Sequence, residues 1–114
     1  MNNLRGEFVL PLPAGSVDVL LNLNALRLCT EAEGIELGDL LERMAKDSLS
    51  IMPKLLYAAY RNNVYLEGST VSYEFEQFAA QVGTLDLEEI LQNVQQAMEA
   101  GEQGNVKAVK AANT

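Results

Sequence analysis

Histidine and tryptophan are absent from this 114-residue chain, and it contains a single cysteine. Without histidine, the chain lacks the usual general base, Ser-His-Asp catalysis and the ligands of most zinc sites. One cysteine can form no intramolecular disulfide and no cysteine-based metal site. Because Cys29 lies among Leu26, Leu28 and Ala32, we expect it to be a small buried hydrophobe. These absences predict a protein that is not an enzyme and uses no cofactor or metal.

Basic residues are also scarce, with 8 Lys and Arg against 16 Asp and Glu, so the formal net charge is −8. An acidic surface repels the phosphates of nucleic acids and anionic lipids. No apolar run approaches the length of a membrane span, and the first residues do not form a signal-peptide pattern. We therefore expect a cytosolic protein whose partners include neither nucleic acid nor membrane.

The length and the 48% content of hydrophobic residues fit one domain with a core of its own. Helical patterns continue to about Ala100, and a Gly-Glu-Gln-Gly-Asn stretch then precedes an Ala, Val and Lys segment. We expect residues 1–100 to form a single α+β domain and residues 101–114 to be a flexible C-terminal tail.

Two short alternating segments near the N-terminus predict β-strands. Apolar residues recur at every second position between Leu4 and Leu10, apart from the small Gly6, and again between Val17 and Leu21. The intervening Pro-Leu-Pro-Ala-Gly-Ser segment ends strand pairing and supplies a turn. The pattern therefore predicts a β-hairpin, which must pack on other elements because an isolated hairpin is only marginally stable in water.

Apolar residues with helical spacing follow in five segments. Capping and helix-ending residues set their predicted limits. These limits are Asn22 or Asn24 to Gly34, Leu37 to Ser48, Ser50 to Asn62-Asn63, Ser72 to Gly83, and Thr84 or Asp86 to about Ala100. Short connections favour antiparallel neighbours. The expected fold class is thus α+β, with an N-terminal β-hairpin followed by a mostly antiparallel cluster of about five helices.

Aromatic residues and the stripe of the last helical segment are the candidates for partner contact. Tyrosine combines an apolar ring with a polar tip, which suits a partly exposed contact surface. We expect Phe75 and Phe78 to be core residues, whereas the tyrosines and the last stripe could serve either the core or a partner. The candidate partner-binding residues are Tyr57, Tyr60, Tyr65, Leu87, Ile90, Leu91 and Val94.

Carboxylates also gather around Gly34. Glu31, Glu33, Glu36 and Asp39 could hold a divalent cation only if the turn made their oxygens converge. A solvated helix end is the simpler interpretation, and we expect no metal there.

Several short motifs resemble one known family, the tail assembly chaperones of siphophages, which are long-tailed bacteriophages. The resemblance covers roughly residues 7–98 and consists of hydrophobic patterns rather than a fixed site. The motifs are Phe8-Val9-Leu10-Pro11-Leu12, Glu33-Gly34-Ile35, Asp39-Leu40-Leu41, Leu56-Tyr57-Ala58-Ala59 and Asp86-Leu87-Glu88-Glu89-Ile90.

The resemblance implies a non-catalytic function in the cytoplasm of the host cell. Such chaperones bind the long helical tape measure protein and keep it soluble while tail tube subunits polymerise around it, and they are absent from the mature virion. A frameshifted longer product is thought to engage the tail tube protein, and the end of this chain, from Gly101, would fit a hinge toward such an extension. Several copies acting together, as a possible homo-oligomer, would coat the client by multivalency.

Two other non-catalytic functions fit the same composition. One is a structural or connector protein that stays in the phage particle. The other is a small acidic regulatory interaction module, such as an antitoxin or an anti-repressor. The genes beside this one would distinguish these alternatives.

Overall fold

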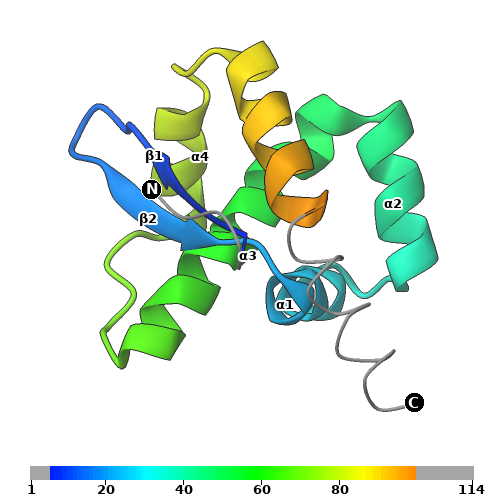
Figure 1. Ribbon diagram of the computed structural model, residues 1–114, viewed down its shortest axis with the longest axis horizontal. Helices are drawn as coiled ribbons and strands as arrows, with labels where there is room; N and C mark the ends of the chain where they lie inside the picture. Colours follow the sequence, from blue (N-terminus) through cyan, green and yellow to red (C-terminus); the bar gives the residue numbers. More distant parts are fainter. Residues whose placement is uncertain (1–5, 100–114) are drawn as a thin grey trace.

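The computed structural model describes residues 6–99, in which a two-stranded hairpin is followed by five helices, so the predicted α+β class is confirmed (Figure 1). The predicted tail 101–114 and the predicted strand residues Leu4 and Arg5 lie outside the described residues. The elements are β1 (Glu7–Leu10), β2 (Val17–Leu20), α1 (Leu23–Glu33), α2 (Leu37–Lys46), α3 (Ser48–Glu67), α4 (Phe75–Val82) and a last helix at residues 87–99, drawn in orange. None of the helices within residues 6–99 is long and apolar enough to cross a membrane.

The hairpin is antiparallel, and Phe8 pairs with Val19. Phe8, Leu10 and Val19 are buried while Val9 is exposed, as period-two alternation predicts. Leu21 lies just beyond β2, and its backbone N–H still donates to the Gly6 carbonyl over 2.9 Å. A Cβ atom on Gly6 would lie 2.1 Å from the Leu21 carbonyl oxygen, so only glycine permits this approach.

Helix α3 forms the centre of the fold and packs against β2, α1, α4 and α2. It spans 20 residues, and buried side chains occur along most of its length. Those buried side chains are Ile51, Met52, Leu55, Leu56, Ala58, Ala59, Tyr60, Asn62 and Val64. The hairpin therefore gains its stability by lying on this helix.

The predicted limits of α3 were wrong at both ends. The helix begins at Ser48 rather than Ser50, and it continues through Asn62 and Asn63 to Glu67. Asparagine disfavours helices because its amide competes for nearby backbone groups. Here the buried Asn62 amide donates instead to the Leu20 carbonyl and to Asn22 Oδ1, over 2.9 and 2.8 Å. These tertiary hydrogen bonds remove the competition, and the helix ends only at a left-handed Gly68.

Cap predictions were confirmed where the cap is local. Asn22 Oδ1 accepts from the backbone N–H groups of Asn24 and Ala25, and Gly34 ends α1 with φ of 66°. Asp86 accepts from the Glu88 N–H at 2.9 Å at the start of the last helix. Ser72 is not a cap, because Glu74 precedes α4 and forms a capping box with Gln77.

Helix α2 differs most from its predicted role. Of its apolar stripe only Leu40 is buried, whereas Leu37 and Leu41 remain 47% and 44% exposed. Among the described elements, the helix packs mainly against α1 and α3, and it lies at one edge of the molecule, on the right of Figure 1. An amphipathic face at the edge of a domain is thus only half covered.

Candidate functional site

The candidate partner-binding residues do not form one surface. Tyr60, Ile90 and Val94 are buried in the core, so in this structure they pack internally and are not available to a partner. Tyr57 is half-buried, and Tyr65 is exposed. Leu87 and Leu91 of the last helix are also exposed, because Ile90, Val94 and Ala97 form its inward side.

Five aromatic rings from α3, α4 and the segment before α4 make one cluster. Ring centroids of neighbouring pairs lie 5.3 to 6.4 Å apart, a spacing typical of favourable aromatic packing. The members are Tyr57, Tyr60, Tyr73, Phe75 and Phe78. Phe78 is fully buried, which confirms its predicted core role, and Tyr65 is not part of the cluster.

The phenol groups of the cluster hold the segment between α3 and α4. The Tyr60 hydroxyl lies 3.0 Å from Ser72 Oγ and accepts from the Ser72 N–H over 2.9 Å. The Tyr57 hydroxyl donates to the Tyr73 carbonyl over 2.7 Å. Burial also raises the pKa of Tyr57, with nearby Arg61 acting in the opposite direction. The polar tips of these two tyrosines are therefore used inside the domain.

A second group of apolar side chains is exposed, and we call it the leucine set. It comprises Leu37 and Leu41 of α2, Leu49 in the first turn of α3, and Leu87 and Leu91 of the last helix. Their exposed fractions range from 36% to 73%. In the view of Figure 1, α2 and the last helix are drawn on either side of the start of α3. The sequence revealed these residues as helical stripes but not which of them stay uncovered.

The carboxylates near Gly34 are engaged with other protein groups. Glu33 accepts from Lys54 Nζ over 2.8 Å and lies 4.0 Å from Arg43. Glu31 pairs with Arg27, and Glu36 with Asp39 forms the capping box of α2. Within residues 6–99 no group of three or more potential ligands is arranged to hold a metal ion.

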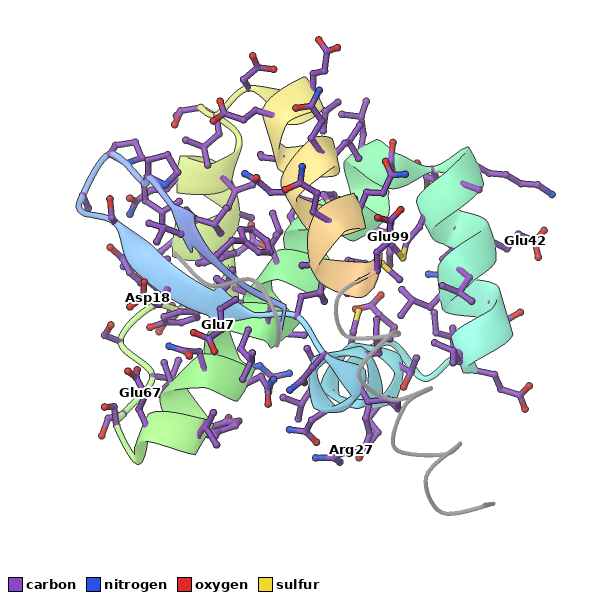
Figure 2. All side chains as sticks on the ribbon, viewed as in Figure 1. Glu7, Asp18, Arg27, Glu42, Glu67 and Glu99 are labelled. Carbon is purple, nitrogen blue, oxygen red and sulfur yellow. The ribbon has the colours of Figure 1, made fainter. Side chains whose placement is uncertain are left out.

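A pocket of about 250 Å³ lies between α1, α3 and the first residue of α4. Sequence reasoning missed it, because its residues come from three separate elements. Its lining residues are Cys29, Ala32, Glu33, Lys54, Tyr57, Ala58, Arg61 and Phe75. Figure 2 shows all the described side chains on the ribbon.

Cys29 in this pocket is not poised for chemistry. Desolvation by burial, together with the nearby Glu33 carboxylate, raises the pKa of its thiol from 9.0 to about 11, while Lys54 and Arg61 oppose the shift. A buried, protonated thiol is a poor nucleophile, and the chain has no histidine to take its proton. The expectation of a small buried hydrophobe at Cys29 is thus confirmed.

Neither models of protein families, nor curated proteins, nor solved structures match this chain.

Proposed function

We propose that the protein is a non-catalytic tail assembly chaperone that binds the tape measure protein of a long-tailed bacteriophage and keeps it soluble. It would act in the cytoplasm of the host cell and leave before the virion is complete. A longer product of the same gene would recruit tail tube subunits. The sequence motifs that resemble this family support the proposal.

The leucine set is the observation that carries the proposal. Full burial of a leucine side chain is worth about 1.5–3 kcal/mol, so an apolar helix laid across several half-exposed leucines would gain substantial free energy. Met44 on α2 and Met98 on the last helix are half-buried at the edge of the same core. Methionine adapts its shape to irregular partners, which suits a client with many different apolar helical faces.

The charge of the chain supports the same function. A net charge of −8 on a chain of this size favours solubility. A chaperone that covers an apolar client needs such a surface, because the complex must stay in solution while the tail tube forms. Several copies bound along one client would act by multivalency, so each individual contact can be weak.

Co-expression with the tape measure protein tests the proposal. The wild-type chain should raise the soluble yield of that protein and co-purify with it in several copies. The double variant Leu41→Ser and Leu91→Ser should lose both effects while its thermal unfolding stays close to wild type. Leu66→Ser is the matched control, since Leu66 is 67% exposed and lies near the end of α3. Figure 2 places Glu67, beside Leu66, on the opposite side of the molecule from Glu42 of α2, so the control leaves the leucine set intact.

The possible outcomes of the co-expression experiment are distinct. An insoluble, unbound tape measure protein would refute the chaperone function. Equal losses in the double variant and the control would refute the role of the leucine set. Detection of the chain in purified virions would favour a structural protein instead.

A further inference from the structure

Arg61 is the exception among the basic residues of the described chain. The other Lys and Arg side chains within residues 6–99 each have a carboxylate partner, whereas no carboxylate there lies within ion-pair distance of Arg61. The observed pairs are Arg27 with Glu31, Arg43 with Glu33, Lys46 with Glu42, and Lys54 with Glu33. An unpaired cation is unexpected in a chain with twice as many acids as bases.

The position of Arg61 makes the missing partner more costly. The side chain is half-buried on α3, and its Nε atom is inaccessible and has no hydrogen-bond partner within the described chain. Buried donors are nearly always satisfied, so an orphaned one calls for a specific explanation. The guanidinium carbon lies 5.5 Å from the centre of the Tyr57 ring, which holds the charge beside the aromatic cluster.

The pocket next to Arg61 completes the arrangement. Its walls include Ala32, Ala58 and Phe75, which offer apolar surface to the stem of a ligand. Its own carboxylate, Glu33, already accepts from Lys54 over 2.8 Å. Among the described residues, the pocket therefore holds one positive charge, that of Arg61, that no carboxylate pairs with.

We propose that this pocket is a carboxylate receptor, in which Arg61 binds one carboxyl group carried on a short apolar stem. A guanidinium matches a carboxylate with two parallel hydrogen bonds, which a lysine cannot reproduce. A small turn of the Arg61 side chain brings Nε to the ligand and satisfies the orphaned donor. The volume of about 250 Å³ lies below the roughly 300–1,000 Å³ of pockets for larger ligands, so it suits a single side chain or a small acid.

The same chemistry has two possible sources, a glutamate side chain of a partner polypeptide and a free carboxylic acid. Titrations of the isolated chain followed by NMR at the Arg61 Nε–Hε resonance distinguish them. The probes are N-acetylglutamate N-methylamide for the side chain, butyrate for the free acid, and N-acetylglutamine N-methylamide as the uncharged control. Inorganic phosphate tests whether any anion suffices.

Both carboxylates should shift the resonance in a saturable way, and the stronger of the two identifies the source. The glutamine compound should leave the resonance unchanged. Absence of a shift with either carboxylate, an equal shift with the glutamine compound, or stronger binding of phosphate would each overturn the proposal.

Variants give a second readout through the backbone amide resonances of Tyr57 and Phe75. Arg61→Gln should abolish the response to both carboxylates, and Arg61→Lys should weaken it about tenfold, because a lysine lacks the planar fork. Arg27→Gln is the matched control, since Arg27 is exposed and does not line the pocket. A response that survives in Arg61→Gln would contradict the proposal. Should Arg61→Gln fail to fold, Arg61→Lys and the wild-type titration still decide. No client is used, so the result is independent of the proposed chaperone function.

Discussion

Helices α2 and α3 both carry apolar residues at helical spacing, yet the fold buries them to very different extents. Helix α3 buries nine of its side chains, whereas α2 buries only Leu40. The two helices are adjacent in the chain, and Asp47 separates them. Helix α3 is also apolar around more of its circumference, so both its sequence and its position in the fold contribute to the difference.

The number of packing partners contributes to this difference. Among the described elements, α3 packs against the hairpin and three helices, while the main contacts of α2 are with α1 and α3. Periodicity identifies the apolar side of a helix, but the other elements decide how much of that side they cover. An incompletely covered side is where a partner can add its own apolar surface, and here it carries Leu37 and Leu41.

Truncation of a leucine in each helix should give the largest contrast. Leu56→Ala in α3 removes a fully buried side chain and should cost about 2–5 kcal/mol in the free energy of unfolding. Leu41→Ala in α2 should cost less than about 1 kcal/mol, because this side chain is already half in water. Urea unfolding of both variants measures the difference. Similar losses would show that α2 is as well packed as α3.

Alanine substitutions at Asn62 and Asn63 test the hydrogen bonds that let α3 continue past its predicted end. Asn62→Ala leaves the Leu20 carbonyl without the buried amide that donates to it, and should cost about 1–3 kcal/mol. Asn63→Ala should cost less than about 0.5 kcal/mol, because the one hydrogen bond of the Asn63 amide within residues 6–99 goes to exposed Glu67. Urea unfolding of the two variants measures both values. Equal losses would contradict the role assigned to Asn62.

The packing of α1 against α3 can be tested through the ionisation of Cys29, a buried residue of α1. Its pKa is 9.0 when exposed and about 11 in the fold. Below pH 9 the thiol is protonated in both states, whereas between pH 9 and 11 the unfolded chain loses the proton first, so stability falls as the pH rises. From about pH 8 to pH 10.5 the wild type should lose about 2 kcal/mol more than Cys29→Ala.

Urea titrations across this pH range measure the effect. Other groups, Tyr57 among them, titrate in both proteins and cancel in the difference between them. Parallel pH curves for wild type and Cys29→Ala would show that water reaches the α1–α3 contact.

Gly38 offers the smallest and opposite effect, in α2. A Cβ atom at this position would meet no neighbour within 4 Å, so Gly38→Ala should stabilise the protein by about 0.5–1 kcal/mol through helix propensity. Gly34→Ala is the control, and its φ of 66° predicts destabilisation instead. Thermal unfolding measures both. A destabilised Gly38→Ala would indicate that a neighbouring element covers α2.

Local chemistry could be predicted from the sequence. The alternation in the hairpin, the Asn22 and Asp86 caps and the Gly34 end depend on residues close in the chain, and the structure contains all of them. The errors arose where groups far apart in the sequence determine the limits of a helix. Asn62 bonds to Leu20 across 42 positions, and Ser72 bonds to Tyr60 rather than capping α4.

Prediction of the candidate binding residues also failed where contacts between distant parts of the chain determine burial. Helical spacing identified Leu87, Ile90, Leu91 and Val94 together, but only the packed structure separates the buried Ile90 and Val94 from the exposed pair. The Arg61 pocket left no mark on the sequence, because α1, α3 and α4 each supply part of its wall.

Site-specific photocrosslinking tests most directly the claim that the half-covered side of α2 holds the client. A photoreactive amino acid replaces Leu41 in one protein and Leu66 in another, and each is co-expressed with the tape measure protein and irradiated. A crosslink to the tape measure protein should form from position 41 and none from position 66. Crosslinks from position 66 alone, or equal yields from both, would contradict the role of α2 in client binding.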